Sequence, residues 1–193
     1  MLAHGEALDV TAPSLLPGWT IGHVLTHLAR NADSMAWALQ SSERGELVDR
    51  YPGGVAGRDA DIAAGAGRPA PEQVADVTAT DERLDAAIAG HTRWDGECRE
   101  LTGSVIGVDQ LVFMRWREVE VHRHDLGLGY EPEDWPAEYA RVELNELTMR
   151  WNARRPMGLT GLPAAALAVP ERQRLTWLLG RAEIAGLDPA GVL

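Results

Sequence analysis

The chain has 193 residues, of which 45% are hydrophobic and 24% charged, a composition typical of globular proteins and unlike that of disordered or collagen-like chains. Its 29 acidic and 18 basic residues give a net charge of −11, which disfavours nucleic acid and anionic membranes as partners. Because no apolar run reaches the roughly 18 residues of a membrane helix and Met1 to Val10 lack the pattern of a secretory signal, we expect a cytoplasmic protein.

The spacing of apolar residues predicts a mainly α-helical protein. The first helix is expected to start near Thr20, a suitable N-cap, and to fade by Gly45. A polar, glycine-rich connection over 51–67 follows, with a short helix expected at 58–64. The other expected elements are helices from Pro71 to near Gly90, from about Val108 to Leu126, from Pro136 to about Arg154 and from Pro170 onward, with a loop or β-hairpin over 93–107.

Four amphipathic helices and a long crossover make a helical bundle the simplest architecture, and bundle cores commonly hold metal sites. We expect the bundle to occupy residues 1–155. A short C-terminal appendage with one helix is expected over residues 156–193.

Histidine and glutamate residues at helical spacing indicate a possible metal site. His27 lies on the apolar stripe of the first helix, between Val24 and Leu28. Glu118 and His122 are four residues apart, so they project from one face of a later helix. Two imidazoles and one carboxylate form the donor set of a catalytic zinc ion with an open fourth position. The spacing alone leaves another interpretation open, in which His27 is a hydrogen-bonded core residue and the later pair lies on the surface.

A second pair, Glu120 and His124, has the same spacing on another face of that helix. Helical spacing around Val121 places the first pair beside the apolar side and the second pair closer to solvent. Asp125 follows His122 by three residues, so it orients that imidazole, caps the helix or lies on the surface.

Cys98 is the only cysteine, which excludes an intramolecular disulfide and a cysteine-rich zinc module. Its polar surroundings contain no adjacent histidine that would activate the thiol, so we expect it to play no catalytic part. All the basic residues are arginines, and the candidates for binding substrate carboxylates are Arg58, Arg115, Arg117 and Arg181.

Four motifs occur in order within residues 13–187. They are Leu-Leu-Pro-Gly-Trp-Thr at 15–20 with His-Val-Leu-Thr-His-Leu at 23–28, Arg-Asp-Ala-Asp-Ile at 58–62, Arg-Glu-Val-Glu-Val-His at 117–122, and Trp-Leu-Leu-Gly-Arg at 177–181. In this combination the chain resembles the mycothiol-dependent maleylpyruvate isomerases, which belong to the DinB-like metal-binding helical bundles.

The resemblance implies a zinc ion held by His27, Glu118 and His122, with Arg58 and Arg181 near the substrate. It implies zinc and mycothiol as cofactors, and the cis–trans isomerisation of maleylpyruvate to fumarylpyruvate in the gentisate pathway of aromatic catabolism. In that reaction the thiolate of mycothiol adds reversibly to the double bond. The implied partners are a small dicarboxylate and a low-molecular-weight thiol, with a monomer and a homodimer both open.

The chain departs from the family at both ends. Family members usually have a full helix before the motif that begins near Ser14, and here too few residues precede it for a bundle helix. We therefore expect a DinB-like four-helix bundle whose first helix is short or missing, followed by a small, reduced C-terminal α/β appendage. Two other functions stay open: a mycothiol S-transferase acting on other electrophiles at the same site, and a non-enzymatic metal-binding helical protein.

Overall fold

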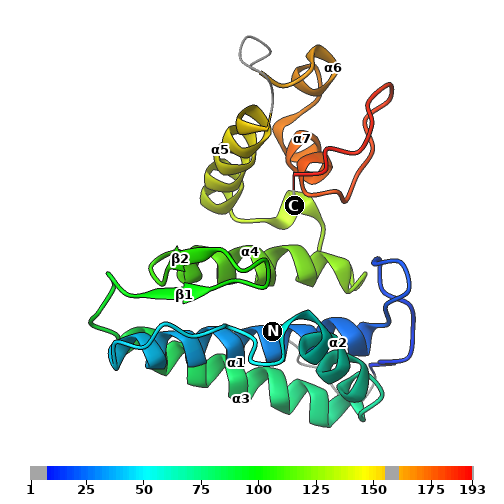
Figure 1. Cartoon of the computed structure of the whole chain (residues 1–193). Helices are drawn as coiled ribbons and strands as arrows, with labels where there is room; N and C mark the ends of the chain where they lie inside the picture. The colour runs from blue at the N-terminus through cyan, green and yellow to red at the C-terminus, as the bar shows by residue number, and fades with distance from the viewer. Residues whose placement is uncertain (1–7, 155–160, 193) are drawn as a thin grey trace. The chain divides into compact units, whose positions relative to one another are not determined.

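The computed structural model describes residues 8–154 and 161–192 (Figure 1). The chain divides into two compact units, residues 1–128 and 129–193. Within the second unit, α5 (Ala137–Ala153) packs against α7 (Glu171–Leu178), and the domain boundary expected at residue 155 stays a prediction. No helix in the described part of the chain is long and apolar enough to cross a membrane.

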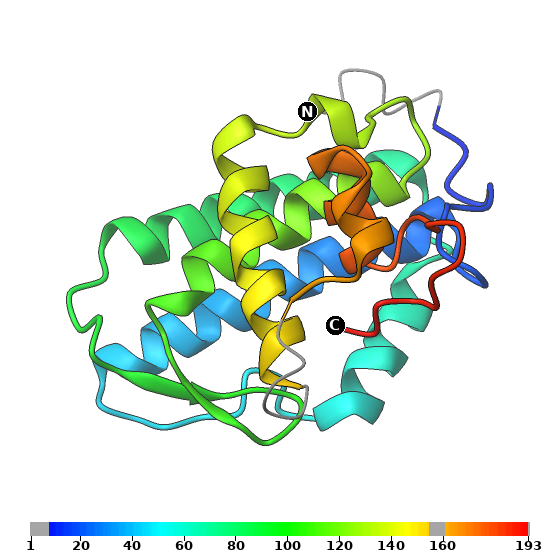
Figure 2. The same cartoon turned by 90° about the horizontal axis from the view of Figure 1, so that it is seen from above.

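The first unit is built around α1 (Ile21–Glu43), which is buried along most of its length. Figures 1 and 2 show α1, α3 and α4 running lengthwise along one another, and both α3 and α4 contact α1. The prediction of a mainly helical fold is confirmed. The remaining elements of the unit are α2 (Gly54–Gly65), α3 (Ala70–Ala89), α4 (Gln110–Asp125) and an antiparallel hairpin of β1 (Glu97–Arg99) and β2 (Val105–Gly107).

Local signals fix the start of α1 where the sequence predicts it. The Thr20 side chain accepts a hydrogen bond from the backbone N–H of His23, and the Thr20 backbone N–H donates to His23 Nδ1, 3.2 Å away. This reciprocal capping satisfies two backbone donors that the helix itself cannot. Between residue 8 and α1 the chain forms turns and an isolated bridge from Pro13 to Thr20. Residues 1–7, part of the segment where a short or missing first helix is expected, lie outside the described residues.

Glycines allow α2 to approach α1 closely. A Cβ at Gly22 of α1 would lie 2.0 Å from the carbonyl oxygen of Ala66, and one at Gly65 would lie 2.5 Å from Cγ2 of Thr26. Neither contact leaves room for a side chain. The helix α2 begins at Gly54, earlier than the expected 58, and this close crossing places its polar side chains beside α1.

The described residues of the second unit, 129–154 and 161–192, form helices and loops, so both strands of the described structure belong to the first unit. The last helix follows Pro170 as predicted. Aromatic pairs fill the core of this unit: Trp151 packs on Trp177 with ring centroids 5.1 Å apart, and Trp135 on Tyr139 at 5.8 Å. The unit also contains a short 3₁₀ helix, Pro132–Asp134, and α6, Ala164–Leu167.

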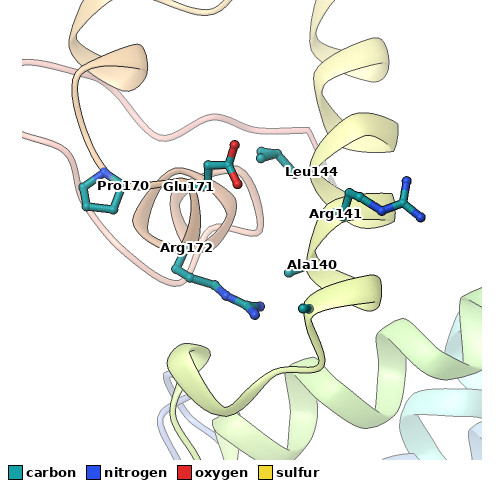
Figure 3. Close-up of a pocket in the computed structure, with 7 residues that line it drawn as sticks. Ala140, Arg141, Leu144, Pro170, Glu171 and Arg172 are labelled. Carbon is teal, nitrogen blue, oxygen red and sulfur yellow. The ribbon is translucent and has the colours of Figure 1, made fainter.

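A cavity of about 330 Å³ lies between α5 and the start of α7 (Figure 3). In Figure 3 the guanidinium of Arg141 points away from it, and Arg172 Nη2 donates to the carbonyl oxygen of Trp135, 2.8 Å away. No predicted site residue lines this cavity. Its lining residues are Ala137, Ala140, Arg141, Leu144, Pro170, Glu171 and Arg172.

Candidate metal centre

Three predicted ligands from two helices of the first unit come together. His27 Nε2 on α1 lies 2.7 Å from Glu118 Oε2 on α4, and His122 Nε2 lies 3.3 Å from the same oxygen. One donor atom from each residue lies within 4.8 Å of the others. Within residues 8–154 and 161–192, this is the only group of three or more His, Cys, Asp or Glu side chains found close enough to hold a metal ion.

The burial of the three side chains is uneven. The His27 side chain is 5% exposed, whereas those of His122 and Glu118 are 14% and 25% exposed. Glu118, the most exposed of the three side chains, is therefore the member of the group that a ligand could approach. An enclosed, four-ligand structural site would leave no such approach.

A buried carboxylate supports one of the two imidazoles. Asp125, which is fully buried, places Oδ2 2.8 Å from His122 Nδ1. Asp125 accepts a hydrogen bond from Nδ1–H, which orients the ring so that Nε2 faces Glu118. Of the three roles open to Asp125 from the sequence, the geometry favours orientation of the imidazole.

Burial and mutual contacts shift the pKa values of all three side chains. Burial alone would raise the pKa of Glu118, but hydrogen bonds from His122 and His27 outweigh it and hold that pKa well below its ordinary value. Burial also opposes the charged form of His122, yet its hydrogen bonds to Asp125 and Glu118 raise its pKa. For His27, burial is the largest effect and lowers the pKa. The site therefore combines an ionised carboxylate with a neutral His27 imidazole.

Arg58 of α2 adjoins this group. Its Nη2 lies 3.2 Å from His27 Nδ1, and its Nη1 pairs with Asp59 Oδ1 at 2.8 Å. Arg181 belongs to the second unit, where its Nη1 donates to the carbonyl oxygen of Leu179, 3.0 Å away. Its expected place near the substrate stays a prediction.

The comparisons with known proteins concern the family and the fold. The mycothiol maleylpyruvate isomerase N-terminal domain family matches residues 1–127. The chain belongs to this family. The matched region contains the three candidate ligands and Arg58, whereas Arg181 lies beyond it. No curated protein matches the chain in sequence.

Two solved structures match over most of the chain. The crystal structure of the mycothiol-dependent maleylpyruvate isomerase has a TM-score of 0.78 and 23% identity, covering 92% of this chain and 82% of its own. The crystal structure of a histidine-to-alanine mutant of a mycothiol-dependent maleylpyruvate isomerase has a TM-score of 0.77 and 22% identity, with the same coverage. At this identity the likeness shows the fold, and the predicted DinB-like helical fold is confirmed.

The sequence had indicated that the second Glu/His pair lies closer to solvent, but both of its residues are buried. Glu120 and His124 are each 8% exposed, and Glu120 Oε1 accepts a hydrogen bond from the indole Nε1 of Trp116, 3.0 Å away. The expectation was wrong because α4 is buried on more than one face and lacks the single apolar stripe on which the inference depended. Neither residue joins the metal-ligand group.

The two remaining arginine candidates make contacts within the fold, and one residue that was not predicted adjoins the site. Arg115 is buried and donates to the carbonyl oxygen of Leu28, so it supports the fold. Arg117 lies over the ring of Phe113 at 5.5 Å. The unpredicted neighbour is Trp19, whose ring packs edge-on against His27 with centroids 5.7 Å apart. Its position just before the N-cap places it at the start of the helix that carries His27.

Proposed function

We propose that this chain converts maleylpyruvate to fumarylpyruvate in a mycothiol-dependent reaction, with a zinc ion held by His27, Glu118 and His122. The observation that carries this proposal is the His₂Glu group, whose donor atoms lie within 4.8 Å of one another in a member of this family. The residues fit zinc, because two imidazole nitrogens and one carboxylate oxygen leave a fourth position open. The carboxylate of Asp125 behind His122 also fits the usual support of a zinc-bound imidazole.

A zinc ion bound there would supply positive charge that stabilises the thiolate of mycothiol. Reversible addition of that thiolate turns the double bond of the substrate into a single bond, about which rotation from cis to trans is possible. The chain contributes binding and orientation. Glu118 stays ionised and shares one oxygen with both imidazoles. Arg58 presents a guanidinium beside His27 that can pair with one substrate carboxylate, and Arg181 is the proposed partner of the other.

An external thiol suits this chain because its own cysteine cannot serve as the nucleophile. Cys98 is fully buried in the core of the first unit. Burial raises the pKa of its thiol to about 11, so the reactive thiolate is scarce at neutral pH.

The test measures zinc content and maleylpyruvate turnover with and without mycothiol. We expect one zinc ion per chain and thiol-dependent turnover, both lost in the variants His27→Ala, Glu118→Ala and His122→Ala. His124→Ala is the matched control, a histidine of the same helix outside the group, and should retain zinc. Circular dichroism establishes that each variant is folded.

The outcomes separate the competing functions. Full zinc content in the three ligand variants would overturn the metal site. Zinc with mycothiol conjugation of other electrophiles but no isomerisation would identify an S-transferase. Zinc without either reaction would favour a non-enzymatic metal-binding protein.

A further inference from the structure

The contact between Arg58 and His27 has hydrogen-bond roles that chemistry dictates. Arg58 Nη2 lies 3.2 Å from His27 Nδ1. A guanidinium carries only N–H donors, so Nδ1 must offer its lone pair. In a neutral imidazole the proton is then on Nε2, which donates it to Glu118 Oε2, 2.7 Å away.

Metal binding requires the opposite arrangement on the same ring. The Nε2 atom of His27 faces the carboxylate oxygen that His122 Nε2 also faces, so Nε2 is the nitrogen available to a metal ion. A metal ion binds through a lone pair, and the ring proton must then lie on Nδ1. Two N–H groups would face each other between Nδ1 and Arg58 Nη2. The observed contact with Arg58 and metal binding through Nε2 therefore exclude each other.

His122 differs from His27 in this respect. Its Nδ1 faces the carboxylate of Asp125 at 2.8 Å, an acceptor that keeps a proton on Nδ1 whichever group Nε2 faces. Metal binding through Nε2 is therefore compatible with the Asp125 contact of His122, whereas His27 must first lose its arginine neighbour.

We propose that Arg58 competes with the metal ion for His27, and that a carboxylate ligand which pairs with Arg58 removes this competition and tightens metal binding. This inference rests on the metal site of the proposed function. Carboxylates are the natural class of ligand, because a guanidinium pairs with them through two parallel hydrogen bonds. Reciprocity requires that the metal ion tighten carboxylate binding by the same factor.

The structure allows Arg58 to move. Only Ile62 and Gly65 of α2 are buried, and the Arg58 side chain is half-buried at the site while its other nitrogen pairs with the exposed Asp59. A rotation of this side chain therefore disturbs no core packing. The coupling can operate without a change in the fold.

The first experiment measures zinc affinity of the metal-free full chain by competition with a chromophoric chelator. We expect Arg58→Ala to bind zinc roughly five- to tenfold more tightly than the wild type, a coupling of ordinary size. Arg58→Gln should behave in the same way, because its amide can turn its oxygen towards Nδ1–H. Arg68→Ala is the matched control, since Arg68 follows α2 and pairs with Asp76 without touching His27.

The second experiment uses maleate as the dicarboxylate probe. Maleate should tighten zinc binding to the wild type by a similar factor and leave the affinity of Arg58→Ala unchanged. An equal effect on both proteins would mean that maleate acts on the metal ion directly, and would overturn the coupling.

A third readout separates competition for the ring from simple charge repulsion. Nitrogen-15 NMR of the imidazoles should show the His27 proton on Nε2 in the metal-free wild type and on Nδ1 after zinc is added. A metal-free wild type with the proton on Nδ1, or Arg58 variants with wild-type zinc affinity, would overturn this inference and leave the metal site intact. A wild type that binds no zinc, or His27→Ala binding it at wild-type strength, would overturn the metal site itself.

Discussion

The contact between Asp125 and His122 predicts how strongly a residue that is not a ligand sets zinc affinity. Asp125→Asn keeps the size of the side chain and an oxygen that can accept from Nδ1, 2.8 Å away, but removes the charge. A hydrogen bond to a charged group contributes about 1.5–3 kcal/mol and a neutral one about 0.5–1.5. The difference of about 1–1.5 kcal/mol corresponds to a five- to tenfold loss of zinc affinity.

The assay is a zinc competition titration on the metal-free full chain, with thermal unfolding of the metal-free protein as a check on folding. Asp125→Ala removes the acceptor altogether and should lower zinc affinity by about 10- to 100-fold, the range seen when such supporting carboxylates are removed. The control is Asp109→Asn, an exposed carboxylate beside the start of the same helix that makes no capping bond. Wild-type zinc affinity in Asp125→Asn and Asp125→Ala, with both variants folded, would refute the reasoning.

Two further predictions concern stability. The folded-state pKa of Glu118 lies well below its ordinary value of 4.5, so its contribution to the free energy of unfolding is present above pH 4.5 and is lost as pH falls through the folded pKa. Glu118→Gln should therefore weaken the loss of stability at acid pH, measured by urea titrations of the metal-free protein. An unchanged dependence of stability on pH would contradict this prediction. A Cβ at Gly22 would lie 2.0 Å from the Ala66 carbonyl oxygen, so Gly22→Ala should lower the free energy of unfolding by about 1–3 kcal/mol. A Cβ at Gly57 on α2 would meet nothing within 4 Å, so Gly57→Ala should raise the free energy of unfolding by about 0.5–1 kcal/mol. Equal effects of the two substitutions in chemical denaturation would show that the close crossing of α1 and α2 does not constrain the fold.

Features that depend on local chemistry were predictable from the sequence. The start of α1 follows from the capping residue Thr20, and the end of α4 from Gly127, whose φ of 69° lies in the left-handed region that favours glycine. The facing of Glu118 and His122 follows from helical spacing. The contact of His27 with these two residues depends on how α1 packs against α4, which helical spacing does not determine. The family resemblance supplied this ligand set.

Features that depend on packing partners were not predictable. The burial of Glu120 and His124 depends on how many faces of α4 are covered, and the sequence of one helix does not record that. The boundary between the units depends on the packing of α5 with α7, which its amphipathic pattern leaves open. The early start of α2 at Gly54 lies in a glycine-rich stretch, where helical propensity is low and tertiary contact with α1 decides.

The distribution of the ligands over two helices connects metal binding to stability. Glu118 and His122 share α4, but His27 comes from α1, so a metal ion bound to all three would link the central helix of the unit to its neighbour. The unfolded chain does not hold the three groups together, so binding free energy adds to folding free energy. The burial of His27 opposes its charged form and so keeps the imidazole neutral, with Nε2 facing the other two ligands and Nδ1 in contact with Arg58. Arg58 occupies that nitrogen, which makes α2 the element through which a substrate could influence both the metal ion and the stability of the unit.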